Sequence, residues 1–240
     1  MSLRALRREM KALGSPEKAA HAMRFFKTGP GQYGEGDRFL GLRVPETRAL
    51  VKAYDDTLSD SDLDTLLDSP IHEERLFALL SLVRRYDSAP KGSSARTHIH
   101  KYYLQKLDRI NNWDLVDTSA PYIPGQHLLD NGSNIAPLHK LAKSPKLWDR
   151  RIGIVATYAF IRTGELAPTF TIADILLNDT HDLIHKASGW MLREAGKRDL
   201  TALEQWLTPR CKQMPRTMLR YAIEKMTPAQ RRAWLAGKPA

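Results

Sequence analysis

Four side chains in this sequence could act together on a cationic group: Trp113, Asp117, Arg151 and Trp190. Each opens or lines a segment with helical periodicity, and these segments recur at a nearly constant interval. Asp117 follows Trp113 by four residues, so the indole and the carboxylate lie on one face of a helix. A carboxylate flanked by aromatic rings suits a cationic sugar or base, and an arginine suits a phosphate. The combination therefore indicates a reaction on a cationic group held in DNA.

The segments that must position these side chains have the pattern of helices. Apolar residues recur at three- and four-residue spacing almost everywhere, as in Leu76, Leu79, Leu80 and Val83, and alternating strand-like runs are hard to find. Proline is tolerated in a first helical turn because an N–H is not needed there. Seven such helix starts are marked by Ser15-Pro16, Val44-Pro45, Ser69-Pro70, Ser144-Pro145, Ala167-Pro168, Met214-Pro215 and Thr227-Pro228. The sequence therefore predicts an all-α fold of many short helices.

A repeat is visible in the positions of basic or aromatic residues near the start of the strongest amphipathic segments. These residues are Arg75, Trp113, Arg151, Lys186 and Arg216, separated by 38, 38, 35 and 30 residues. Helix pairs of about 40 residues predict a HEAT-like solenoid whose second helices line a concave, basic surface. On such a wall, side chains one repeat apart become neighbours. We expect one domain over residues 1–240, with a non-repeating helical bundle as the alternative because the units share little identity.

Composition narrows the classes of partner and compartment. The 37 Lys and Arg residues exceed the 27 Asp and Glu residues and give a formal net charge of +10, which attracts polyanions such as nucleic acid. Many basic proteins bind no particular polyanion, so charge alone does not decide. The lone Cys211 has no intrachain partner, and no segment has the pattern of a signal peptide or a membrane span. We expect a cytoplasmic monomer with no membrane association and no obligate protein partner.

Two further motifs formally match known sites but lack the context those sites need. The segment Gly29-Pro30-Gly31-Gln32-Tyr33-Gly34 fits GxGxxG, yet it follows a helix rather than a strand and runs into Glu35 and Asp37. We expect a surface loop there. His181 and His185 have the i, i+4 spacing of two metal ligands, but no third ligand is clearly spaced after them. We therefore predict no metal and no cofactor.

The candidate site residues also have ordinary structural explanations. An indole such as Trp113 can fill a core gap, and a carboxylate such as Asp117 can cap a helix or pair with an arginine. The adjacent Arg150 and Arg151 could form a solvated helix face. We interpret Trp148 and Trp206 as structural. Spacing alone favours these explanations, and only convergence of the four side chains argues for a site.

At these residues the chain resembles the AlkD-like DNA glycosylases, a family of HEAT-like repeat proteins that remove alkylated purines. The similarity covers most of the chain. It is carried by Met23-Arg24-Phe25-Phe26-Lys27, Gly41 to Arg48, Asn112 to Asp117, Trp148 to Arg151 and Ile184 to Glu194. Together these segments are fairly specific for the family.

The resemblance implies a role for each candidate residue. The family's catalytic carboxylate falls on Asp117, its site tryptophans on Trp113 and Trp190, and its site arginine on Arg151. The resemblance also places three residues near DNA: Phe25, Arg43 and Arg193. Arg43 replaces a neutral polar residue, and Asp182 and Leu183 stand where some members have aromatic residues, so the damage preference and the grip on one strand are open.

The resemblance implies a DNA repair enzyme that hydrolyses the N-glycosidic bond of N3- or N7-alkylated purines in double-stranded DNA and leaves an abasic site. No lysine nucleophile is evident beside Asp117, so we expect a monofunctional glycosylase without lyase activity. Two alternatives stay open. One is a non-catalytic HEAT-like protein that binds DNA structure or damage, and the other is a protein-interaction scaffold that does not bind DNA.

Overall fold

The computed structural model describes residues 2–237. Within this range the chain is helical and contains no β-strand, although Arg38 and Ile71 pair in an isolated bridge. The chain divides into two compact units, an N-terminal unit that ends at Ser119 and a C-terminal unit that begins at Ala120. None of the described helices is long and apolar enough to cross a membrane. The predicted all-α fold is confirmed, and the prediction of a single domain stays a prediction.

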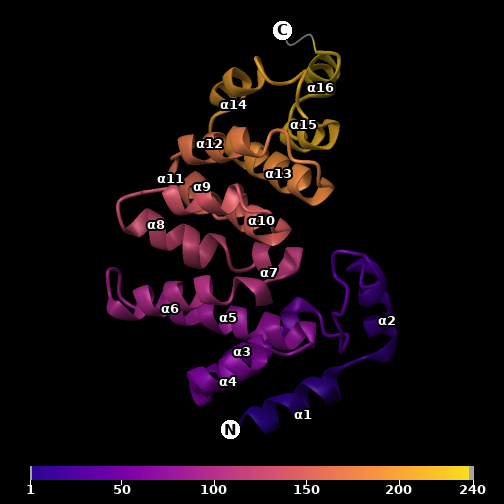
Figure 1. Cartoon of the computed structure of the whole chain (residues 1–240), viewed down its shortest axis with the longest axis vertical. Coiled ribbons are helices and arrows are strands. Elements are labelled where there is room, and N and C mark those ends of the chain that lie inside the picture. The colour runs from indigo at the N-terminus through magenta and orange to yellow at the C-terminus, as the bar shows by residue number, and fades with distance from the viewer. Residues whose placement is uncertain (1, 238–240) are drawn as a thin grey trace. The chain divides into compact units, whose positions relative to one another are not determined.

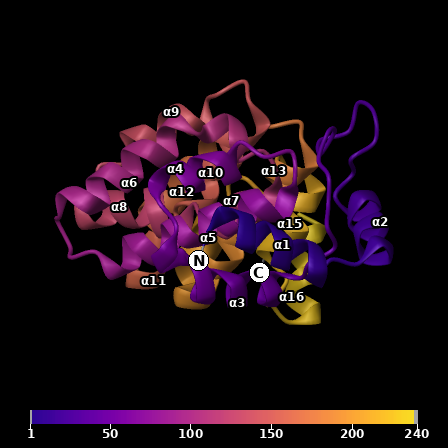
Figure 2. The ribbon, with the colours of Figure 1, turned by 90° about the horizontal axis from the view of Figure 1, so that it is seen from below.

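The N-terminal unit is built around one long central helix, α5, against which α3, α4, α6 and α7 pack. Its apolar residues Leu76, Phe77, Leu79 and Leu80 are buried. Helix α2 and the loop that follows it lie at one edge of the unit, away from α4 and α6 (Figures 1 and 2). The helices are α1 (Leu3–Leu13), α2 (Pro16–Phe25), α3 (Val44–Tyr54), η1 (Asp55–Thr57), α4 (Asp60–Leu67), α5 (His72–Ser88), α6 (Ser94–Gln105), η2 (Leu107–Arg109) and α7 (Trp113–Asp117).

The C-terminal unit is centred on α13, which packs against α10, α12, α14 and α15 (Figure 1). Gly189 lies where α13 meets α15, and a Cβ at this position would stand 2.5 Å from the Met218 carbonyl oxygen. Only glycine allows this approach of the two backbones. The helices are η3 (Pro121–Gly125), α8 (Gln126–Asp130), α9 (Ala136–Ala142), α10 (Leu147–Val155), α11 (Tyr158–Thr163), α12 (Ala167–Ile175), α13 (Asp182–Arg198), α14 (Leu200–Leu207), α15 (Arg216–Ala222) and α16 (Pro228–Leu235).

The predicted helix starts are confirmed at all seven prolines, because a helix begins within two residues of each. The residues that marked the repeat lie on five different helices, α5, α7, α10, α13 and α15. In the N-terminal unit α5 packs on α7 and on α4, and in the C-terminal unit α13 packs on α10, α12 and α15. Helix pairing of this kind is what a helical repeat requires. The concave basic face predicted for the whole chain stays a prediction.

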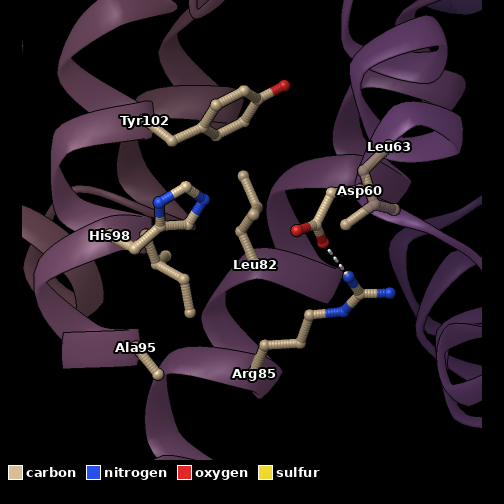
Figure 3. A pocket seen from close by; sticks show the side chains of 8 residues that line it. Asp60, Leu63, Leu82, Arg85, Ala95, His98 and Tyr102 are labelled. Carbon is tan, nitrogen blue, oxygen red and sulfur yellow. Dashed lines mark hydrogen bonds and ion pairs between the residues drawn. The ribbon is translucent and has the colours of Figure 1, made fainter. Parts of the chain in front are cut away.

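A small pocket of about 260 Å³ opens between α4, α5 and α6 (Figure 3). Leu63, Leu82 and Ile99 contribute apolar surface to it, and His98 and Tyr102 line it from α6. None of the candidate site residues predicted from the sequence lines this pocket, which is therefore separate from the side chains considered below.

Candidate active site

Helix α7 carries the first two candidate residues at its two ends, Trp113 and Asp117. The helix has five residues, far below the ~12–15 that an isolated helix needs to persist in water, so other parts of the chain must hold it in place. Asn112 caps its start, with Oδ1 accepting a hydrogen bond from the Trp113 amide at 2.9 Å. At the other end, the Thr118 hydroxyl donates to the Asp114 carbonyl oxygen at 2.6 Å. Trp113 and Asp117 lie four residues apart on this helix and share a face.

A buried network of charges holds the start of α7 against α5. His72 lies between two carboxylates, with Nδ1 3.0 Å from Asp37 Oδ2 and Nε2 2.7 Å from Asp114 Oδ2. Arg75 Nη2 donates to Asp37 Oδ1 at 2.6 Å, and Asn112 Nδ2 donates to Asp37 Oδ2 at 3.1 Å. All five side chains are buried. Two cations and two anions balance in this network, so the residues on both sides of Trp113 are tied to α5 and to the loop that ends at Asp37.

The network changes the acidity of its members. Burial of the imidazole lowers its pKa, but the charge of Asp114 and the hydrogen bonds to both carboxylates outweigh burial and raise the pKa of His72 to about 9. Burial raises the pKa of the Asp37 carboxyl, yet the hydrogen bond from His72 and the charge of Arg75 bring that pKa below its ordinary value. His72 is therefore an imidazolium at neutral pH, and Asp37 is ionised.

A stack of aromatic rings connects His72 with Trp113. The Trp113 indole lies on the Phe26 ring, with centroids 5.1 Å apart, and Phe26 lies 5.0 Å from the His72 ring. Phe39 covers His72 from another side at 4.6 Å. Phe25 meets the indole edge-on at 5.8 Å. The position of the Trp113 indole is thus fixed both through its backbone and through its ring.

Asp117 is half-buried at the end of α7. Its charge lies close enough to Tyr103 to contribute, after burial, to raising the pKa of that phenol. The Tyr103 hydroxyl lies 3.0 Å from Ser119 Oγ, and Ser119 Oγ donates to the Leu115 carbonyl oxygen at 2.5 Å. The end of α7 is therefore anchored on α6.

Two residues predicted to approach DNA, Phe25 and Arg43, line one open groove of about 630 Å³ in the N-terminal unit. Phe25 is 56% exposed, and 71% of the Arg43 side chain is exposed. Arg43 forms an ion pair with Glu46 at 2.9 Å, at the start of α3. Lys18 and Arg24 add positive charge along the groove. The structure thus brings together an exposed aromatic ring and several cations beside the α2 end of the aromatic stack.

Arg150 and Arg151 have different surroundings in the C-terminal unit. Arg150 Nε donates to Asp179 at 2.6 Å, and its Nη1 donates to the carbonyl oxygens of Ser144 and Pro145. These contacts hold the segment just before α10 against the helix. Arg151 is 5% exposed, and its Nη1 donates to the Leu183 carbonyl oxygen at 2.7 Å. The guanidinium of Arg151 is thereby fixed at the start of α13.

Trp190 and Arg193 lie further along α13. Trp190 is half-buried, about two turns from the residue that Arg151 contacts, and its ring lies 6.4 Å from that of Tyr158. Arg193 forms ion pairs with Glu224 and, at 3.1 Å, with Glu194. Its side chain is 17% exposed, so any contact with DNA requires competition with these carboxylates.

The four predicted catalytic residues fall in both units. Trp113 and Asp117 belong to the N-terminal unit, whereas Arg151 and Trp190 belong to the C-terminal unit. Trp113 and Asp117 share one face of α7, whereas Arg151 contacts α13 at Leu183, about two turns before Trp190. That all four converge on one substrate stays a prediction.

Comparison with known proteins identifies the family. The sequence profile of the DNA alkylation repair enzymes matches residues 6–226, which is most of the chain. The chain belongs to the DNA alkylation repair enzyme family. This membership assigns it to DNA repair and makes DNA its substrate. No curated protein shows significant sequence similarity to it.

A solved structure agrees with this family membership. It is described as a predicted DNA alkylation repair enzyme from Enterococcus faecalis and is 16% identical to this chain, with a TM-score of 0.69. The match covers 90% of this chain and 97% of the other. At this level of identity the likeness concerns the fold.

The structure shows the surroundings of the two motifs that formally match known sites, the GxGxxG segment and the pair His181 and His185. The Gly29 to Gly34 segment follows α2 and does not open a helix, and its loop ends at Asp37 in the buried network. His181 Nδ1 accepts a hydrogen bond from the Leu183 amide at 3.1 Å, and His185 Nε2 lies 2.5 Å from the Asp179 carbonyl oxygen. Within residues 2–237, no group of three His, Cys, Asp or Glu side chains could hold a metal ion.

Sequence reasoning missed the buried network of this DNA repair protein. Arg75 served only as a repeat marker, although its side chain is 2% exposed and bound to Asp37. His72 and Asp37 carried no signal of their own. Asn112 and Asp114 did flank Trp113 in the sequence segment that carries the resemblance, and that closeness was the one available clue.

Proposed function

We propose that this protein is a monofunctional DNA glycosylase that hydrolyses the N-glycosidic bond of N3- or N7-alkylated purines in duplex DNA. The observation that carries the proposal is the pair formed by Trp113 and Asp117, which share one face of a firmly anchored helix in a member of the DNA alkylation repair enzyme family. The AlkD-like resemblance of the site residues supports the same assignment.

The alkylated base makes a carboxylate the useful catalytic group. An N3- or N7-alkylated purine is already cationic, so the bond from C1′ to the base breaks with its electron pair going to the base, and the sugar gains oxocarbenium character. Asp117 would stabilise that charge and orient the water whose oxygen bonds to C1′, taking up the proton that the water loses. The product is an abasic site. Opposite charges ~4 Å apart at an effective dielectric of ~20 attract by about 4 kcal/mol, or roughly three decades in rate, as an upper value.

The other candidate residues would bind rather than react. Trp113 and Trp190 would flank the deoxyribose and the cationic nucleotide, where each aromatic face contributes about 0.5–2 kcal/mol. Arg151 would hold a backbone phosphate and fix the register without reading sequence, which requires DNA to reach a guanidinium that is 5% exposed and bound to the Leu183 carbonyl oxygen. The groove beside Phe25 and Arg43 supports a further contact with the DNA backbone, because it combines an exposed ring with cations.

Release of N7-methylguanine from a duplex tests this function directly. We expect wild-type protein to release the base above the spontaneous background, and Asp117→Asn to lower the rate by at least about tenfold while DNA binding persists. Asp56→Asn is the matched control, because its side chain is 82% exposed and it lies in the same unit. Equal rates for wild type and Asp117→Asn would remove Asp117 from the mechanism.

Two rival functions are separated by the same duplex. A non-catalytic damage-binding protein would bind it with the salt dependence of phosphate contacts but release no base. A protein-interaction scaffold would show no salt-sensitive binding at all. Lyase activity would contradict the monofunctional assignment and would appear as a protein–DNA adduct trapped by borohydride.

A further inference from the structure

The buried network touches both neighbours of Trp113 in the chain. Asn112 Oδ1 accepts a hydrogen bond from the Trp113 amide, and Asn112 Nδ2 donates to Asp37. One oxygen of Asp114 accepts from the Leu115 amide at 2.9 Å, and the other accepts from His72. The first turn of α7 is therefore held from two sides by groups that meet at His72.

We propose that His72 is a positioning residue for Trp113 and α7, an inference that rests on the proposed glycosylase function. Held between Asp37 and Asp114, His72 fixes how far the first turn of α7 lies from α5. The Asp117 carboxylate, one helical turn beyond Trp113, is carried by the same short helix and follows its orientation.

The geometry requires the imidazolium form. A neutral imidazole has one N–H and can donate to only one carboxylate, whereas an imidazolium donates to both. Loss of the proton would leave either Asp37 or Asp114 facing a nitrogen lone pair at hydrogen-bonding distance. It would also turn a neutral group of two cations and two anions, completed by Arg75, into a buried net negative charge.

The aromatic stack gives His72 a second connection to Trp113. Phe26 lies between the two rings, in contact with the indole on one side and with the imidazolium on the other. Phe26 and Phe39 present ring surfaces to a buried cation, an arrangement that is more attractive while His72 is charged than when it is neutral. Deprotonation therefore weakens the support of the indole as well as that of the backbone.

The direction of the pH dependence follows from the raised pKa of His72. The charged groups that face the ring are Asp37 from the loop, Asp114 from α7 and Arg75 from α5. Because the folded-state pKa of His72 lies above its ordinary value of about 6.5, the stabilisation from its contacts with Asp37 and Asp114 is fully present below pH 6.5 and is lost as the pH rises through about 9. The orientation of Trp113 should change over the same interval.

Fluorescence of Trp113 tests this positioning without any enzyme assay. The chain has five tryptophans, so the signal of Trp113 is the difference between wild type and Trp113→Phe. We expect this difference to change between pH 7 and pH 10 with a midpoint near 9, and to lose that transition in His72→Gln. His98→Gln, which removes an exposed histidine of the same unit, should keep it.

Single-turnover base release tests whether the positioning matters for the reaction. We expect His72→Gln to lower the rate constant by about tenfold or more while the dissociation constant for DNA changes by less than about threefold, because misplacement of a catalytic group acts on the chemical step. The wild-type rate should fall above pH 9, measured against enzyme-free DNA at each pH, and His72→Gln should lack this alkaline limb.

The outcomes separate the two proposals. A Trp113 signal that is flat from pH 7 to pH 10 in folded wild type would overturn the positioning role, and this measurement needs no variant at His72 to fold. Parallel loss of fold and rate in His72→Gln, with an unchanged pH profile in wild type, would reduce His72 to a structural residue. If wild type releases no base at any pH, the glycosylase function fails, and the fluorescence transition still decides whether His72 positions Trp113.

Discussion

In the N-terminal unit Trp113 and Asp117 lie on a helix of five residues, whereas in the C-terminal unit Trp190 lies on a helix of 17 residues. The short helix cannot be stable alone, and buried charges hold it in place. The long helix is held by close approach of backbones, as at Gly189, and by apolar side chains such as Met191 and Leu192.

This contrast shows two ways to fix a side chain for chemistry. A hydrogen-bonded ionic network gives direction, since each contact has a preferred geometry, but it depends on the protonation of its members. Close packing of helices gives position without charge, and it depends only on volume. The stability of the N-terminal half of the predicted site should therefore fall when the pH rises or a charge is removed. The stability of the C-terminal half should fall when atoms are added to its packed helices.

The largest effect should come from Asp37→Ala. This change removes the acceptor for His72, Arg75 and Asn112 at once and leaves two buried cations with one carboxylate. Breaking a buried pair in this way costs about 3–5 kcal/mol of unfolding free energy. Urea unfolding should show this loss, and hydrogen exchange should show that protection falls in α7 and not in α13.

The exposed Asp56 provides the control for that change. Asp56→Ala removes the same carboxylate from a side chain that is 82% exposed, and it should alter the unfolding free energy by less than about 1 kcal/mol. A loss of similar size in both variants, or equal loss of protection in α7 and α13, would abolish the distinction between the two halves.

A smaller effect is expected from Gly189→Ala in the C-terminal unit. The added Cβ would stand 2.5 Å from the Met218 carbonyl oxygen and 2.5 Å from Tyr221 Cβ, so α13 and α15 must separate. Overpacking of this kind costs about 1–3 kcal/mol. Because no charge is involved, the loss measured by urea unfolding should be the same at pH 7 and pH 10.

The neighbouring Ser188 gives the matched control for Gly189. Its buried hydroxyl has no hydrogen-bond partner among the described residues, so Ser188→Ala removes an atom from the same helix and should leave stability unchanged or slightly increased. A Gly189→Ala loss that grew with pH would show that a titrating group also holds the contact between α13 and α15.

The sequence predicted the packed parts of this molecule better than its ionic parts. Prolines marked the helix starts because their effect is local, and the i, i+4 spacing placed Trp113 and Asp117 on one face for the same reason. The network could not be predicted, because His72 meets Asp37 and Asp114 across 35 and 42 residues.

Composition at the start of α5 was also misleading. The run His72-Glu73-Glu74-Arg75 has the pattern of a solvated first turn, yet all four side chains are buried. Glu73 accepts hydrogen bonds from the amides of Leu40, Gly41 and Leu42. A single sequence carries no sign of such long-range acceptors, so burial of a charge is visible only in the structure.

The smallest effects should distinguish the two arginines predicted to approach DNA. Arg43→Ala should lower the slope of log affinity against log salt by about 1, as expected for one lost phosphate contact, because its side chain is 71% exposed. Arg193→Ala should change affinity by only about twofold, since Arg193 must first leave Glu224 and Glu194. Glu224→Gln should weaken that competition and bring the effect of Arg193→Ala closer to that of Arg43→Ala.

The titration uses undamaged duplex DNA, with Arg231→Ala to correct for the loss of one positive charge. If Arg193→Ala outweighs Arg43→Ala in the wild-type background, then binding to DNA is strong enough to break the ion pairs of α13, and the C-terminal half would be the more adaptable of the two.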